Sequence, residues 1–175
     1  MESWPPSADV LLHPPSLALE NLRWRAALTN LWLAHPEPDV INPLLSLSAK
    51  NILWTFNALY FTHDPRQQPA ERPFCLYPHE VELIQSLESH LTDGRDLLIE
   101  KTRDMGVTWC VLGWLLWHWR FDPAFNAIIG SRLEDLIDEK GNLDTHFERL
   151  RWMLRNLPAW WLPEKFDESR HIALA

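Results

Sequence analysis

Apolar positions recur at helical spacing in three stretches of the first half of the chain. They predict helices over residues 17–34, from 44 or 46 to 61, and over 78–91. Residues 62–74 between the last two are rich in proline and charge, which predicts a surface loop. Four prolines within residues 1–16 predict an extended arm, because proline removes a backbone donor and fixes φ.

The pattern changes after residue 94. It predicts a strand over 96–100, a turn over 101–106, an apolar helix over about 107–120 and a second buried strand over 124–130. This order is typical of a βαβ unit, whose parallel strands lie inside a covered sheet. Further helices are predicted over about 133–140 and 143–157, followed by a corner at 159–162. The helix over 107–120 is apolar on nearly all sides, which predicts burial against a sheet.

Composition narrows the functional classes. The 175 residues carry 16 Lys and Arg against 24 Asp and Glu, a formal net charge of −8, which argues against a free-standing nucleic-acid coat. Two cysteines form neither a disulfide framework nor a zinc site and suit a reducing cytoplasm. The longest apolar stretch is too short to cross a bilayer, and we expect no membrane partner and no secretory leader. Eleven tryptophans indicate large buried aromatic surfaces.

The segment with the clearest chemistry joins the first predicted strand to the apolar helix. It reads Lys101, Thr102, Arg103, Asp104, Met105, Gly106, Val107 and Thr108. A phosphate-binding loop belongs at this place in a nucleotide-binding α/β domain. Its second glycine would be Gly106 and its hydroxyl residue Thr108, while the lysine is moved to the start of the loop. An ammonium on a long stem can reach the phosphates from either end, but the same residues also suit an ordinary solvated turn.

Four segments in order resemble the ATPase domain of phage terminase large subunits, the motors that pump DNA into procapsids. They are the deviant Walker A loop at 101–109, Phe61-Thr62-His63-Asp64-Pro65-Arg66, Leu76-Tyr77-Pro78-His79-Glu80, and the run 129–141. The Leu157-Pro158-x-Trp160 ending also fits. The resemblance covers roughly residues 44–175. It implies the N-terminal portion of such a subunit, in the cytoplasm of a bacterial host.

The resemblance implies an α/β fold: an incomplete P-loop NTPase core of the RecA-like (ASCE) type, of which the chain holds the first βαβ unit after a helical N-terminal region. Residues 1–43 would be a proline-rich arm and lead-in helix, 44–94 a helical region with an adenine-binding segment, and 95–175 the first half of the core. ATP and Mg²⁺ are the implied cofactors. Lys101 would hold the β- and γ-phosphates, Thr108 the Mg²⁺ through its hydroxyl, and Arg103 would be an accessory cation. Tyr77 and Glu80 would contact adenine. Double-stranded DNA, the portal protein and the small terminase subunit are the implied partners, within an oligomeric motor.

Two departures keep other interpretations open. Glu80 stands where the family has glutamine, and a carboxylate only accepts hydrogen bonds; Tyr77 and Glu80 equally suit a plain helix entry. No apolar run after residue 106 ends in the Asp-Glu pair of a Walker B motif, which ATP hydrolysis in this class needs, and we expect no catalytic residue in this chain. The alternatives are a non-catalytic, truncated prophage remnant and a helical protein-interaction module.

Overall fold

The structure, a computed structural model, describes residues 11–164 and 166. Most of the predicted arm (residues 1–10) and the end of the proposed core (165 and 167–175) lie outside the described residues. The chain divides into two compact units. The first contains residues 1–76 and 156–162, and the second contains 77–155 and 163–175.

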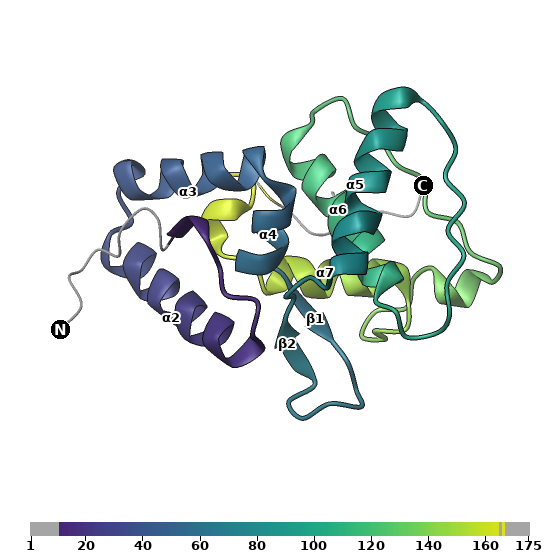
Figure 1. Ribbon diagram of the computed structural model, residues 1–175, viewed down its shortest axis with the longest axis horizontal. Coiled ribbons are helices and arrows are strands. Elements are labelled where there is room, and N and C mark those ends of the chain that lie inside the picture. The colour runs from purple at the N-terminus through teal and green to yellow at the C-terminus, as the bar shows by residue number, and fades with distance from the viewer. Residues whose placement is uncertain (1–10, 165, 167–175) are drawn as a thin grey trace. The chain divides into compact units, whose positions relative to one another are not determined.

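Three helices make up most of the first unit (Figure 1): α2 (Ala18–Ala34), α3 (Pro38–Lys50) and α4 (Ile52–Ala58). The helix predicted over 17–34 is confirmed by α2. The helix predicted from 44 or 46 to 61 is wrong as one element, because the backbone is extended at Asn51 (φ −143°). The side chain of Asn51 accepts a hydrogen bond from the Trp54 amide at 2.9 Å and so caps α4. Helix α3 begins early because Pro38 suits the first helical position.

A β-hairpin follows α4. Strands β1 (Phe61–His63) and β2 (Glu71–Pro73) pair antiparallel, with Thr62 opposite Arg72. The prediction of an irregular surface loop over 62–74 is therefore wrong at both ends and right only for the exposed connection, where Asp64 and Arg66 pair at 2.9 Å. Paired backbone groups can hold short strands even where the side chains are polar.

Aromatic rings form much of the core of the first unit. Phe56 meets Tyr60 and Phe74 edge to face, with ring centroids 4.9 and 5.1 Å apart. Trp161, in the short 3₁₀ turn η2 (Ala159–Trp161), packs on Tyr60, and its indole N–H donates to the Ser48 hydroxyl at 2.8 Å. Trp54 and Trp161 are buried, as the abundance of tryptophan predicts, whereas Trp24, Trp32 and Trp160 are half-buried.

The second unit is helical. Helix α5 (Pro78–Asp93) runs two residues beyond the predicted 78–91 and ends at Gly94 in the left-handed region, and α6 (Val107–Phe121) agrees with the predicted apolar helix. Helix α7 (His146–Arg155) is shorter than the helix predicted over 143–157. Only the 3₁₀ turn η1 (Glu134–Leu136) occupies the helix predicted over 133–140.

Neither strand of the predicted βαβ unit forms. Residues 95–101 and 124–130 have no helical or strand structure, and Figure 1 draws the connection from α5 to α6 as a plain loop. Leu98 is 95% exposed and Ile128 is 100% exposed. A strand exists only when a neighbour supplies hydrogen bonds, and within the described residues neither segment has such a neighbour. The described part of the chain combines six α-helices, α2–α7, with one small two-stranded sheet.

Helix α6 is buried by helices instead of the expected sheet. It packs against α5 and α7, and Cys110, Leu112, Trp114 and Leu116 are buried along it. Trp114 and His118 both bond the Glu88 carboxylate of α5, at 2.5 and 2.7 Å. Helices α5 and α7 thus cover the apolar surface of α6, and the Glu88 carboxylate bonds its polar groups. Within the described residues, no helix is both long and apolar enough to cross a membrane.

Candidate nucleotide site at the start of helix α6

The loop before α6 has the backbone of a tight turn into a helix. Residues 101–105 are exposed, and Gly106, with φ at +72°, is the residue immediately before α6. Asp104 is also left-handed, with φ at +65°, which is uncommon for a residue other than glycine. Two left-handed residues two positions apart turn the chain sharply from the extended segment into the helix. The glycine of the proposed phosphate loop therefore occupies a position that needs glycine.

The structure places the proposed phosphate ligands around the first turn of α6. Lys101 and Arg103 are exposed, and neither makes an ion pair within the described part of the chain. Thr108 is half-buried, one residue after Val107, in the first turn of the helix. The first amides of an α-helix lack intrahelical acceptors, and the helix dipole is positive at this end. Cations, amides and a hydroxyl thus share one short stretch of chain.

Glu80 from helix α5 meets this turn, a contact between residues 26 positions apart. Its side chain is 4% exposed, and its Oε2 accepts a hydrogen bond from the Tyr77 amide at 2.9 Å. Its Oε1 lies so close to the place that a Cβ on Gly106 would take that a larger residue at 106 would require the carboxylate to shift. The Cys110 thiol, one turn into α6, hydrogen-bonds the same carboxylate. Glu80 therefore joins the starts of two helices.

Burial has the largest effect on the pKa of the Glu80 carboxyl group. It raises the pKa of Glu80, although the hydrogen bonds from Tyr77 and Cys110 act in the opposite direction. Burial, the nearby Glu80 charge and the hydrogen bond to Glu80 together raise the pKa of Cys110, so this thiol is a poor nucleophile. A raised pKa favours the neutral carboxyl, which weakens its repulsion of a phosphate at the loop.

The two residues predicted to contact adenine, Tyr77 and Glu80, differ in their surroundings. Tyr77 is 63% exposed and stacks on His79, with ring centroids 5.8 Å apart. Its ring therefore lies on the protein surface. Glu80 is buried and engaged at the helix start, as the helix-entry interpretation expects. The structure brings Glu80 to the loop and leaves Tyr77 on the surface, at the start of the same helix.

A phosphate group fits the donor set of the loop better than a metal ion does. Lys101, Arg103 and the helix amides are all suited to an anion. Thr108 offers one hydroxyl, and within the described residues no group of three or more His, Cys, Asp and Glu could hold a metal ion. A Mg²⁺ ion would therefore arrive with the nucleotide, bound largely by phosphate oxygens and water.

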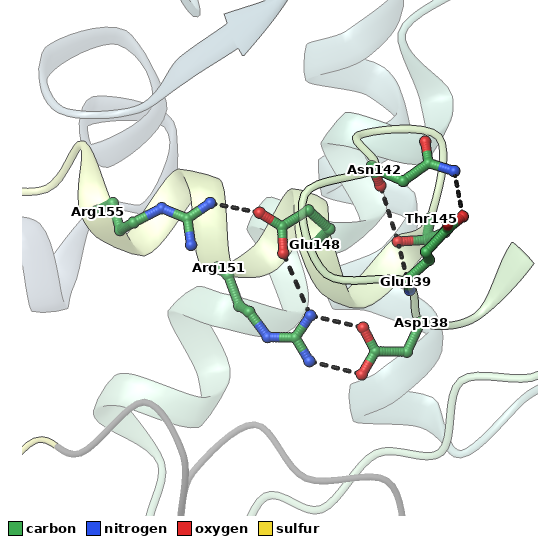
Figure 2. A network of polar contacts seen from close by, with 7 residues as sticks. All are labelled: Asp138, Glu139, Asn142, Thr145, Glu148, Arg151 and Arg155. Carbon is green, nitrogen blue, oxygen red and sulfur yellow. Dashed lines mark hydrogen bonds and ion pairs between the residues drawn. The ribbon is translucent and has the colours of Figure 1, made fainter.

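A second polar network lies on α7 and the loop before it (Figure 2), and sequence reasoning missed it. Arg151 forms a two-pronged ion pair with Asp138, with both N–O distances at 2.5 Å, and also reaches Glu148 at 3.3 Å. Glu148, 3% exposed, pairs with Arg155 as well. The spacing of Glu148, Arg151 and Arg155 along one helix face was the available signal. All the charges pair internally, so the network supports structure.

In comparisons with known proteins, no family model matches this chain, and no curated protein or solved structure matches it significantly.

Proposed function

We propose that this chain is the nucleotide-binding part of a phage terminase large subunit, a DNA-packaging motor of the P-loop ATPase class. Lys101 holds the β- and γ-phosphates of ATP in this proposal, Arg103 assists, and Thr108 binds the Mg²⁺ that accompanies the nucleotide. The partners proposed with it are double-stranded DNA, a portal protein and a small terminase subunit. The place of action is the cytoplasm of a bacterial host.

One observation carries the nucleotide proposal: the turn at Gly106. The φ of +72° and the contact with Glu80 favour glycine at this position, just before a 15-residue helix whose first turn is preceded by two exposed cations. Anion binding at a helix start needs this combination of close backbone approach, amide donors and positive charge. The four terminase-like sequence segments supply the identity of the anion, a nucleotide phosphate.

A helical protein-interaction module is the second candidate, and the unpaired segments favour it. Within the described residues the only sheet is the β1–β2 hairpin, and the second unit packs α6 between helices. A chain of this kind would need no nucleotide, and the loop before α6 would be an ordinary turn. A non-catalytic remnant is the third possibility. It would bind nucleotide without hydrolysing it, because the sequence lacks a Walker B pair.

Nucleotide affinity distinguishes these candidates. We would titrate the purified chain with a fluorescent ATP analogue in the presence of Mg²⁺ and repeat the titration with Lys101→Ala. Removing a charged phosphate contact costs ~1.5–3 kcal/mol, so the variant should bind about tenfold more weakly or worse. Lys140→Ala is the matched control, because Lys140 is also exposed, lies in the same unit and carries the same charge.

The expected result is a loss confined to Lys101→Ala. Equal affinities for wild type and both variants would remove Lys101 from its proposed role. No binding by the folded wild-type chain would favour the interaction module.

A further inference from the structure

Arg25 is a buried cation without a carboxylate partner. It lies on α2 in the first unit, is 6% exposed, and its partners are all neutral. Its Nε donates to Asn21 Oδ1 at 2.6 Å, and its Nη2 donates to the carbonyls of Phe56 and Asn57 at 3.2 and 2.9 Å. Nη1 is buried and has no hydrogen-bond partner. A guanidinium with a missing partner is costly in a protein interior.

The surroundings supply no compensating negative charge. Burial lowers the pKa of Arg25 to about 9, and the one ionisable group that acts in the opposite direction is the thiol of Cys75. Burial raises the pKa of Cys75, so this thiol is neutral near pH 7. The Arg25 guanidinium carbon lies 4.6 Å from the centre of the Phe61 ring, which attracts the cation but supplies no counter-charge. The site is therefore positively charged and uncompensated.

A pocket of about 280 Å³ adjoins this cation, and both Arg25 and Phe61 form part of its wall. The rest of the wall is mostly apolar, and it includes Leu22, Ala26 and Trp32. All the residues that line it belong to the first unit. Its volume lies just below the usual range for small-molecule sites, ~300–1,000 Å³. Arg25 is the one charged residue among the described residues that line the pocket, and a mostly apolar wall with a few polar groups is the usual composition of small-molecule sites.

We infer that this pocket binds a small carboxylate with an apolar body, the carboxylate pairing with Arg25 and the body packing against Phe61 and Trp32. Such a ligand satisfies both deficits at once: it gives the guanidinium a counter-charge and covers apolar surface. An inorganic anion would satisfy only the first, and a neutral apolar molecule only the second. The site is independent of the loop before α6, which lies in the other unit.

The test uses octanoate and its neutral isostere octanamide as probes, titrated calorimetrically into the wild-type chain near pH 7. The two molecules bury the same chain, so any difference in affinity reports the charge. Octanoate should bind at least about tenfold more tightly than octanamide, because hydrogen bonds to charged groups are the strong ones. Equal affinities, or no binding of octanoate, would overturn the inference.

Two variants locate the site. Ala26→Phe adds volume at an exposed position of the pocket wall and leaves every hydrogen bond of Arg25 in place, so it should abolish octanoate binding in a folded protein. Arg23→Gln removes an equal charge from an exposed position on the same helix and should leave the affinity unchanged. Octanoate binding that survives Ala26→Phe, or that falls with Arg23→Gln, would contradict the assignment.

Discussion

Gly106 combines two constraints that substitution can separate. Ala at a left-handed φ costs ~1–2 kcal/mol through the backbone alone. Gly94→Ala measures this cost, because Gly94 has φ of +64° and open space around its Cα. Gly106→Ala should lower the free energy of unfolding by about 1–3 kcal/mol more, because its Cβ also overlaps Glu80.

Gly130→Ala is the control for the added methyl group, since Gly130 has neither a left-handed φ nor an atom within 4 Å of the new Cβ. Urea unfolding of the three variants would measure the order of stability. Equal losses at 94 and 106 would show that the Glu80 contact imposes no constraint.

Glu80 predicts an unusual pH dependence. Its pKa is raised in the folded chain, mainly by burial, so the folded state holds this proton more tightly than the unfolded state does. The contribution of Glu80 to stability is therefore fully present below its ordinary, unfolded pKa and is lost as pH rises through the raised folded value. Glu80→Gln keeps an acceptor for the Tyr77 amide and removes the titration.

Relative to Glu80→Gln, wild type should lose stability over that pH interval and then level off. The measurement is the free energy of unfolding of both proteins between about pH 4 and pH 8, since ordinary glutamate titrates near ~4.3. A difference that is constant across this range would show that the carboxyl is not desolvated.

At the scale of elements, the ion-pair network on α7 is the clearest contributor to stability. Glu148 is buried between Arg151 and Arg155, so Glu148→Ala leaves two cations without their shared partner. Breaking a buried pair from one side costs ~3–5 kcal/mol, and partial exposure of Arg155 places the expected loss at the lower end.

Asp144→Ala provides the matched comparison. Asp144 is 88% exposed and lies 3.9 Å from Arg149 in the same unit, so its loss should cost under ~0.5 kcal/mol. Thermal or urea unfolding distinguishes the two variants. Similar small losses for both would mean that the network in Figure 2 is open to solvent.

The sequence predicts the helices better than it predicts the strands, for a physical reason. Helices α2, α5 and α6 follow from local spacing, prolines and a left-handed stop at Gly94. The strands predicted over 96–100 and 124–130 depend on partners elsewhere, which local pattern cannot supply. The β1–β2 hairpin was missed because charge and proline dominate its connection.

For the candidate site too, the sequence predicts the local features but not the contacts between separate elements. Local pattern locates the loop at Lys101–Thr108 and the need for glycine at 106, because loop and helix are contiguous. It does not locate the Glu80–Gly106 contact, which joins separate elements. Arg25 was missed as well, because a charged residue in a helix ordinarily indicates the solvent face.

At the scale of the whole chain, the exposed apolar segments predict self-association. Leu98 and Ile128 are almost fully exposed in segments outside any helix or strand, and exposed apolar side chains favour association. Wild type should form oligomers in light scattering, and Leu98→Glu with Ile128→Glu should shift it toward monomer without a lower melting temperature. Leu33→Glu, at an exposed position on α2, is the control. A monomeric wild type with a sharp melt would contradict this prediction.

In the function that we propose, the loop before α6 binds the phosphates of a nucleotide. Hydrogen–deuterium exchange of the wild-type chain, with and without Mg²⁺ and a non-hydrolysable ATP analogue, tests it most directly because it needs no substitution. We expect slower exchange over residues 101–110, where the loop and the first amides of α6 lie, and around Glu80. Unchanged exchange over 101–110 at saturating nucleotide, or protection confined to the first unit, would contradict it.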